Sequence, residues 1–335
     1  MASKELWTWV YQRCPRHTFN HPPSKLIKNM RANVRYIPPI DLSKLEGPDH
    51  DEVVNQIVRA VETLGFFQVV NHGVPIELLD SLKQTAHNFF GLPPERKSVY
   101  RKEVSPSPLV KYGTSFVPEK EKAWKGKSIL AWLTPMMMKL FNSDLDVALQ
   151  YLKTSHEMVR KLLEALLGNL GAELDDSKID GFIGKKMVNM NFYLTCPNPE
   201  LTISVRHHSN MDTLTILLQD GIGGLYIKVP QDVNMEKKGE WVEIPPISGA
   251  LIINISDMLQ IWSNGRYKSA EHIVHTTSTK SRVSIPIFTT HNQHKRLHHY
   301  PKWWRKMETA RYKEFLFSDY MNNFFGNAHH SQKIY

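Results

Sequence analysis

The sequence predicts an α+β fold in which a helical front half is followed by an antiparallel β-sandwich or jelly roll. Between residues 51 and 64, apolar residues recur at the spacing of one helix face. From about residue 186 the sequence consists of short runs of strand-forming residues, separated by Pro, Gly and Asn. There are seven such runs: Met187 to Leu194, Thr213 to Leu218, Gly224 to Val229, Trp241 to Ile244, Ala250 to Ile255, His272 to His275 and Arg282 to Thr289.

The elements of the front half follow from periodicity and turn residues. Residues 1–36 contain a Pro- and Lys-rich stretch and are predicted to form an extended arm that leads into a helical region over 37–170. That region is expected to hold helices at Asp51 to Leu64, Ile76 to Phe90 and about Asp144 to Leu170, with a short strand at Gly65 to Asn71. The strand-rich region spans 186–295, and the aromatic tail, 302–335, is predicted to pack back as a C-terminal helix.

Composition bounds the class of protein and its partners. The 335 residues are 41% hydrophobic and 22% charged, as in folded globular chains. The net charge of +9 is scattered, without an RNA-binding motif or a basic helix stripe, which argues against nucleic acid and suits anionic small molecules such as carboxylates or acyl-CoA thioesters. Two cysteines, Cys14 and Cys196, form no disulfide framework, and no signal peptide or membrane-length apolar run is present. We therefore expect a cytoplasmic protein.

Two of the sixteen histidines stand beside predicted strands. His208 precedes the run that begins at Thr213, and His272 begins a run of its own. Ten residues after His272, Arg282-Val-Ser284 begins another strand. Spacing alone does not decide whether these residues are functional or structural. A histidine in a strand is often structural, and an arginine can donate hydrogen bonds to nearby backbone carbonyls.

Six ordered motifs add to this pattern. They are Gly65-Phe-Phe-Gln-Val-Val-Asn-His-Gly73, Asn191-Phe-Tyr193, Thr213-Leu-Thr-Ile-Leu-Leu-Gln-Asp220, Gly223-Gly-Leu225, Ser263-Asn-Gly-Arg-Tyr-Lys-Ser269 and Arg282-Val-Ser284. Together they resemble the plant iron(II)- and 2-oxoglutarate-dependent dioxygenase family, from about Ile37 to the tail.

Three further segments resemble one branch of that family, the feruloyl-CoA 6′-hydroxylases and scopoletin 8-hydroxylases. They are Tyr112-Gly-Thr-Ser-Phe116, Trp124-Lys125 and Phe317-Ser-Asp-Tyr320. The branch implies a planar phenylpropanoid substrate, either a CoA thioester or a coumarin. The segment 126–138, with Trp132 and a Met triplet, departs from the branch pattern and leaves an alkaloid or another aromatic metabolite open.

The resemblance implies a double-stranded β-helix (jelly roll) core and a metal site at its mouth. In such enzymes two histidines and one carboxylate hold iron and leave positions for 2-oxoglutarate and oxygen, and ascorbate serves as reductant. The resemblance maps the metal histidines to His208 and His272. It implies that Arg282 pairs with the distal carboxylate of 2-oxoglutarate, helped by Ser284 and Tyr193, with Asn191 nearby, as a guanidinium fork suits a carboxylate. It also implies a monomer without membrane or nucleic-acid partners.

The chain departs from the family at the third metal ligand, because Asn210 stands where the carboxylate is expected. In an extended segment residues 208 and 210 point to the same side, so Asn210 offers the metal a neutral amide oxygen. The lost charge interaction is on the order of several kcal/mol, so iron should bind more weakly. Asp212 lies roughly 6.6 Å further along a strand and reaches the metal only if the segment curls back. His207 should face the other way.

Three functions remain open at this stage. The first is an oxygenase with a degenerate His-x-Asn metal site that hydroxylates an aromatic metabolite. The second is a non-oxidative cyclase, isomerase or lyase that uses His208, His272, Asp212 or Tyr193 as acid or base. The third is an inactive binding paralogue, or a chain in which the carboxylate was deliberately replaced to trap a complex. A halogenase is a weaker variant of the first, because Asn210 fills much of the space that a halide would need.

Overall fold

The computed structural model describes residues 38–101, 104, 110–114, 127–133, 143–197, 199, 205–230, 239–290, 296–297, 311–312 and 315–326. Several sequence predictions lie outside these ranges. They concern the extended arm over 1–36, Cys14, the pair Trp124-Lys125, the Met triplet at 136–138 and the start of the tail helix at 302–310. The side chains of 127–133 also lie outside the described part of the chain.

Two sheets form the body of the protein. Within the described residues, the main sheet has eight strands in the order β1-β2-β10-β7-β12-β5-β4-β3, and the smaller sheet has four in the order β6-β11-β8-β9. The main-sheet strands are β1 (Ile40–Asp41), β2 (Phe66–Val70), β3 (Val110–Thr114), β4 (Lys127–Leu133), β5 (Lys185–Tyr193), β7 (Leu214–Gln219), β10 (Leu251–Ile255) and β12 (Arg282–Thr290). The smaller sheet consists of β6 (Val205–His208), β8 (Leu225–Lys228), β9 (Trp241–Glu243) and β11 (His272–Val274). A short ribbon pairs β13 (Arg296–Leu297) with β14 (Phe315–Leu316).

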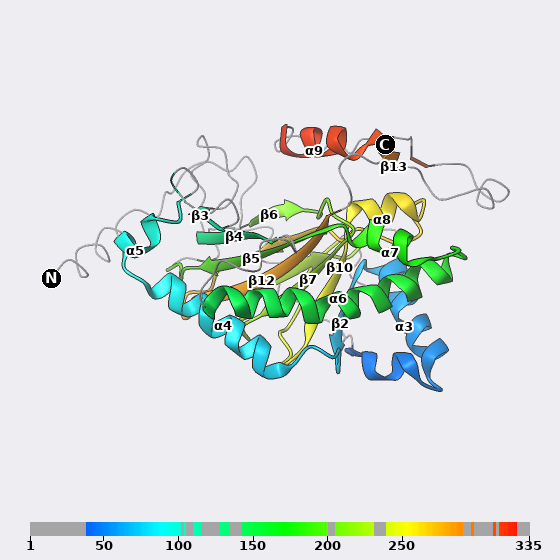
Figure 1. The fold of residues 1–335 in the computed structure, drawn as a ribbon, viewed down its shortest axis with the longest axis horizontal. Helices are drawn as coiled ribbons and strands as arrows, with labels where there is room; N and C mark the ends of the chain where they lie inside the picture. The colour runs from blue at the N-terminus through cyan, green and yellow to red at the C-terminus, as the bar shows by residue number, and fades with distance from the viewer. Residues whose placement is uncertain are drawn as a thin grey trace.

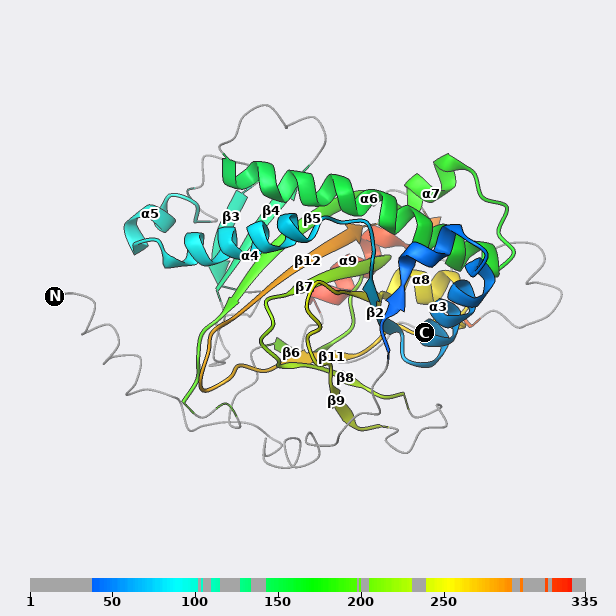
Figure 2. The ribbon, with the colours of Figure 1, turned by 90° about the horizontal axis from the view of Figure 1, so that it is seen from below.

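Helices cover one face of the main sheet, and the smaller sheet lies on its other side (Figures 1 and 2). The long helix α6 runs across the sheet beside α4 and α3. The helical elements are η1 (Leu42–Glu46), α3 (His50–Thr63), α4 (Ile76–Gly91), α5 (Pro94–Ser98), α6 (Ser143–Asn169), α7 (Asp176–Ile183), α8 (Asp257–Trp262) and α9 (Phe317–Gly326). None of the helices in the described ranges has the length and apolar character needed to cross a membrane.

The main sheet has two differently used faces, because side chains alternate along each strand. On β7, Leu214, Ile216 and Leu218 belong to the apolar core that the helices cover. The alternate residues face the smaller sheet, where Leu217 packs with Ile252 in a second core. The space between the two sheets therefore receives one face of β5, β7, β10 and β12. Every site residue on these four strands lies on that face.

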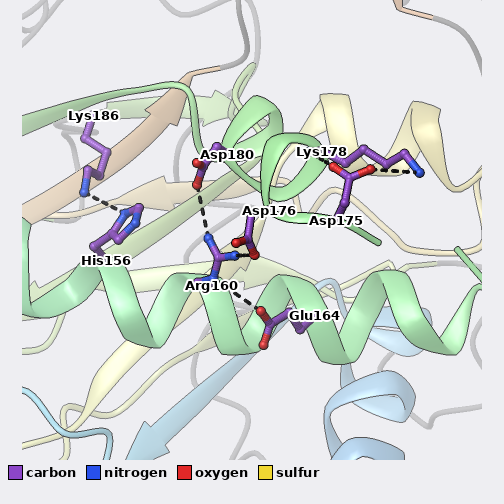
Figure 3. A network of polar contacts seen from close by, with 8 residues as sticks. All are labelled: His156, Arg160, Glu164, Asp175, Asp176, Lys178, Asp180 and Lys186. Atoms are coloured by element: carbon purple, nitrogen blue, oxygen red, sulfur yellow. Dashed lines mark hydrogen bonds and ion pairs between the residues drawn. The ribbon is translucent and has the colours of Figure 1, made fainter. Parts of the chain in front are cut away.

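Charged groups join α6 to α7 and to the start of β5 (Figure 3). Arg160 of α6 forms ion pairs with Asp176, with Asp180 at 3.2 Å and with Glu164 at 3.3 Å. These pairs are partly exposed, so each contributes little stability. Lys186 of β5 donates to His156 Nδ1 at 3.0 Å and to the Leu152 carbonyl at 3.2 Å, so β5 is tied to α6 at the end remote from Tyr193.

Most predicted elements are confirmed, with boundary shifts of one or two residues. This holds for the seven strand-like runs, the strand before Asn71 and the three front-half helices. Two differences matter for the site. His208 precedes β7 as predicted but is also the last residue of β6, a strand that was not predicted. The front half supplies β1 to β4 to the main sheet, so helices and strands are less segregated than expected. The described part of the tail forms β14 before α9, so its helix begins at Phe317.

Candidate metal and cosubstrate site

Two histidines face each other across adjacent strands of the smaller sheet. The antiparallel pairing of β6 with β11 places His208 directly opposite His272. Their ring centroids are 4.2 Å apart, and the ring planes are inclined by 52°. His207 is exposed, as expected from alternation along the strand. The pairing thus brings together two imidazoles that lie 64 residues apart in sequence.

His272 is held as a neutral imidazole. Burial and the neighbouring His208 lower its pKa to about 3. Its Nδ1 atom lies 3.2 Å from the Ala270 carbonyl oxygen and 3.4 Å from Asn254 Nδ2. Its Nε2 atom has no hydrogen-bond partner among the described residues. A neutral ring anchored through Nδ1, with Nε2 left over, suits metal ligation.

Asn210 follows the end of β6 and is buried, with 8% of its surface exposed. Its Nδ2 donates to Thr215 Oγ1 at 2.9 Å, and its main-chain oxygen accepts from the amide of Asp257 at 2.8 Å. Its Oδ1 makes no hydrogen bond with any described residue. Thr215 is paired in register with Asn254, which contacts His272. Asn210 and His272 are therefore linked through two neighbouring strand residues.

The Asp257 carboxylate anchors the segment around Asn210 to the C-terminal helix. Asp257 Oδ2 accepts from Ser209 Oγ at 2.9 Å and from the hydroxyl of Tyr320. Tyr320 lies on α9, in one of the motifs that carry the branch resemblance. The last helix thus braces the loop that positions Asn210.

Asp212 is directed elsewhere. The chain bends over residues 211–213, and the Asp212 carboxylate accepts from Thr290 Oγ1 at 3.1 Å, at the opposite end of β12 from Arg282. Burial raises its pKa to about 6. No three His, Cys, Asp or Glu side chains in the described ranges are grouped so that they could hold a metal ion. The bend therefore does not bring Asp212 into a three-ligand set with His208 and His272.

Arg282 lies on the same face of the main sheet as Thr215 and Asn254, at the start of β12. It begins β12 opposite Tyr193, is 1% exposed, and holds its guanidinium carbon 5.2 Å from the Tyr193 ring centre. Its Nη2 donates to Gln219 Oε1 at 2.8 Å and its Nε to the Ile222 carbonyl at 3.3 Å. Its Nη1 is buried and has no hydrogen-bond partner among the residues that the structure describes. Burying a guanidinium with an unpaired donor lowers the free energy of unfolding unless an anion occupies the adjacent space.

Hydroxyl and amide groups surround the guanidinium. Ser284 is paired in register with Asn191, whose Nδ2 donates to Ser284 Oγ at 3.3 Å. Ser284 Oγ lies 3.5 Å from the Tyr193 hydroxyl. The structure thus brings Arg282, Ser284, Tyr193 and Asn191 together on one face of two paired strands.

Three residues that contact the candidate site were missed by sequence reasoning: Thr215, Gln219 and Asn254. Each is a buried polar residue within an otherwise apolar strand. That mismatch was the available signal, because an apolar strand retains a buried polar side chain only where a partner satisfies it.

One surface cavity lies next to Arg282, because its lining includes Ile222, whose carbonyl accepts from Arg282 Nε. It has a volume of about 520 Å³ and is lined by His87, Phe192, Asp220 and Lys280 among others. Phe192 points to the opposite face of β5 from Asn191 and Tyr193, and it stacks on Phe90 of α4. This cavity therefore lies between α4 and the chain at the ends of β5 and β7.

The donor sets fit the two groups that the sequence resemblance implies. Two imidazoles and an amide oxygen without a hydrogen bond can hold a divalent metal, although without an anionic ligand. The buried guanidinium with a free Nη1 fits a carboxylate. Thr215 and Gln219, on the same face of β7, contact Asn210 and Arg282 respectively and are separated by four residues, roughly 13 Å of strand.

Comparisons with known proteins agree with this geometry. Residues 184–291 match the 2OG-Fe(II) oxygenase superfamily, and residues 37–138 match the family described as non-haem dioxygenase in morphine synthesis N-terminal. In structure, JOX2 in complex with 2OG, Fe and JA superposes with a TM-score of 0.70 at 28% identity, covering 91% of this chain and 93% of that one. The rice dioxygenase for auxin oxidation has a TM-score of 0.72 at 23% identity, covering 88% and 96%, and shares the fold.

Curated relatives identify the branch. Scopoletin 8-hydroxylase of Arabidopsis thaliana is 54% identical over 94% of this chain and 88% of its own length. Feruloyl CoA ortho-hydroxylase 1 of the same plant is 43% identical over 89% of this chain and 81% of its own. The predicted family, the jelly-roll fold and the named branch are confirmed. By these matches, the chain belongs to the 2OG-Fe(II) oxygenase superfamily.

Proposed function

We propose that the protein is a 2-oxoglutarate-dependent hydroxylase of plant specialised metabolism that acts on the aromatic ring of a coumarin of the scopoletin type. The relative at 54% identity, named for scopoletin, supports this substrate class. The feruloyl-CoA ortho-hydroxylases, at 41–43% identity, make a feruloyl-CoA-type thioester the second candidate. We further propose that it acts as a monomer in the cytoplasm, in keeping with the implications of its family and its cysteine usage.

In this proposal the face of the main sheet toward the smaller sheet holds the metal near Thr215 and the cosubstrate's distal carboxylate near Gln219. His208, His272 and the Oδ1 atom of Asn210 hold iron(II). Arg282 binds the distal carboxylate of 2-oxoglutarate through its free Nη1, with Ser284 and Tyr193 adding hydroxyl groups and Asn191 orienting Ser284. Ascorbate, typical for the family, keeps the metal reduced.

The bound groups supply the oxidation: dioxygen oxidises 2-oxoglutarate to succinate and carbon dioxide, and the second oxygen atom enters the substrate ring. The chain's own residues bind and orient. Arg282 neutralises one end of the dicarboxylate in a place that water does not reach. The apolar residues between the sheets, Leu217 and Ile252 among them, keep the cavity dry.

The observation that carries the proposal is the buried Nη1 of Arg282. Nε and Nη2 have protein partners, whereas Nη1 makes no hydrogen bond of ordinary distance and angle with a described residue, although Tyr193 and Asp220 interact electrostatically with the guanidinium. A structural arginine would be expected to satisfy all three through the protein, because unpaired buried donors are rare. The free donor therefore supports an anionic ligand in this position.

The first test is anaerobic. Iron(II) and 2-oxoglutarate are added to the metal-free protein, and the visible metal-to-ligand absorption band is measured in the protein and in Asn210→Asp. We expect a band in both, stronger in the variant. A band in the variant alone would overturn the proposal and favour metal-free catalysis or binding.

The second test is aerobic. The protein is incubated with iron(II), ascorbate, 2-oxoglutarate and either scopoletin or feruloyl-CoA, and succinate and products are measured by mass spectrometry. We expect scopoletin to gain one oxygen atom, with one succinate formed per product. Turnover of feruloyl-CoA alone would move the substrate to the second candidate. Conversion of an aromatic substrate without succinate would overturn the oxygenase proposal.

A further inference from the structure

Thr215 and Asn254 interrupt two strands that are otherwise apolar on the cavity face. The two strands read Leu-Thr-Ile-Leu-Leu-Gln over Leu214–Gln219 and Leu-Ile-Ile-Asn-Ile over Leu251–Ile255. Thr215 and Asn254 are 4% and 9% exposed, and they are direct partners in the antiparallel register. Burying a polar pair here costs free energy unless each member has a specific partner.

Each member contacts one side chain of the metal site. Thr215 Oγ1 accepts from Asn210 Nδ2 at 2.9 Å. This contact turns the amide nitrogen toward β7, so that Asn210 presents Oδ1, the atom without a hydrogen bond, as the group available to a cation. Orientation matters more for an amide than for a carboxylate, because only one of the two terminal atoms of an amide can donate a lone pair to a metal.

Asn254 contacts the other side chain. Its amide lies 3.4 Å from His272 Nδ1, while its own Oδ1 is buried without a hydrogen bond. A histidine that gives Nε2 to a metal carries its proton on Nδ1 and needs an acceptor there. Turning the Asn254 amide over, an assignment that depends on the hydrogen-bond network, provides that acceptor beside the Ala270 carbonyl. It also satisfies the otherwise unpartnered oxygen.

We propose that Thr215 and Asn254 form a positioning pair that aims the metal-binding atoms of Asn210 and His272. Thr215 holds the Asn210 amide nitrogen away from the metal, and Asn254 accepts the Nδ1 proton of His272 through its Oδ1. The inference rests on the proposed metal site. It explains how a neutral asparagine serves as the third ligand, since its oxygen is aimed in advance.

The test is the affinity of the metal-free protein for Co(II), followed by the absorption of the bound ion or by calorimetry. Thr215→Val should weaken Co(II) binding by about 10–100-fold, the range seen for groups that orient metal ligands. Thr215→Ser, which keeps the hydroxyl, should stay close to the parent protein. The matched control is Thr289→Val on the adjacent strand β12, because the Thr289 hydroxyl bonds only to the main chain of Leu214. We expect the control to lower stability without changing Co(II) affinity.

Asn254 is tested with two variants that differ in the acceptor. Asn254→Leu removes it, and Co(II) affinity should fall. Asn254→Asp keeps an oxygen acceptor and removes the amide donor, and Co(II) binding should be retained. Loss of binding in Asn254→Asp but not in Thr215→Ser would overturn the assigned role of the Asn254 oxygen.

The outcomes separate this inference from the proposed function. If the parent protein binds no Co(II) with or without 2-oxoglutarate, the metal site itself fails. If the parent binds Co(II) and folded Thr215→Val binds it equally well, the positioning role of Thr215 fails while the metal site stands. Thermal unfolding of each variant shows which are folded. If Thr215→Val does not fold, the Co(II) affinities of the two Asn254 variants test the positioning role instead.

Discussion

The two groups of polar residues between the sheets, one around Arg282 and the other around His272 and Asn210, differ in charge. In the first, Arg282 keeps a buried positive group with a free donor for a carboxylate. In the second, the groups facing the proposed metal include a neutral His272 and the amide of Asn210, where the family pattern has an anion. On the proposed roles, the chain keeps the arginine for the cosubstrate and has Asn210 in the place of an anionic metal ligand. In this arrangement the dicarboxylate itself supplies negative charge beside the metal, so cosubstrate and metal should bind cooperatively.

The largest effect is expected at the Arg282 end. Arg282→Leu removes two charge-assisted hydrogen bonds to the carboxylate, each worth about 1.5–3 kcal/mol. The affinity for 2-oxoglutarate, measured by calorimetry with excess Co(II), should therefore fall by at least about 100-fold. Arg282→Lys should lose part of the affinity, because lysine keeps the charge without the fork.

Lys280→Met is the matched control for Arg282. It removes a positive charge two residues away, on an exposed turn. We expect 2-oxoglutarate affinity to change little, since exposed charges are screened. If the Arg282→Leu and Lys280→Met variants bind 2-oxoglutarate equally well, Arg282 is structural and the comparison between the two ends collapses.

A smaller change, in the opposite direction, is expected at the metal end. Asn210→Asp restores a negative ligand, and Co(II) affinity in the absence of 2-oxoglutarate should rise by about 10–100-fold after the cost of burying the charge. The gain should shrink when 2-oxoglutarate is present, because the cosubstrate already brings negative charge to the site. Titrations with and without 2-oxoglutarate measure both effects.

Asn88→Asp adds the same charge on the exposed surface of α4 and serves as the control for Asn210→Asp. Its Co(II) affinity should match that of the parent protein. An equal gain from the two substitutions would mean that overall charge, and not a ligand at residue 210, governs metal binding.

Asp212 provides the test of whether another carboxylate replaces the missing ligand. Its hydrogen bond to Thr290 directs it away from the histidine pair. Asp212→Asn should therefore leave Co(II) affinity within about three-fold, well below the 10–100-fold expected when a ligand or its support is lost. His272→Ala, assayed in parallel, should abolish binding. A loss in Asp212→Asn that approaches the loss in His272→Ala would make Asp212 a ligand after all.

The sequence predicted the fold well because its signals are local. The apolar period of α3 and the turn residues between short strands depend on neighbouring residues alone, and both predictions are confirmed. The four strands that the front half gives to the main sheet were harder to foresee as sheet members. β2 pairs with β10, nearly two hundred residues later in the sequence. A local sequence pattern does not predict which distant strand will be the pairing partner.

The candidate site divides in the same way. Strand pairing places His208 opposite His272 and Arg282 opposite Tyr193, while the roles that the resemblance implies for them stay predictions. The course of the chain beyond Asn210 was open, since a continuing strand and a bend aim Asp212 differently, and the structure shows a bend. The partnership of Thr215 with Asn254 could not be predicted, because it depends on the register between β7 and β10.

The smallest effect is expected at the start of β5, where Lys186 contacts His156 of α6 and the two residues have a structural role. Burial and the positive charge of Lys186 lower the pKa of His156, while Glu157 and Asp180 act against this shift and Arg160 adds to it. A histidine held neutral contributes stability above its unfolded pKa, and that stability is lost as the pH falls through about 6.5. In His156→Gln the side chain can still accept from Lys186 but no longer titrates. Between about pH 8 and pH 5 the free energy of unfolding should therefore fall less than in the parent protein. The difference should be a few tenths of a kcal/mol, because the pair is partly exposed. Urea unfolding at the two pH values measures this change, and the affinities for Co(II) and 2-oxoglutarate should stay at their parent values. A change in either affinity would show that the α6 end of β5 is coupled to the cavity and that the two ends of the site are not independent of their scaffold.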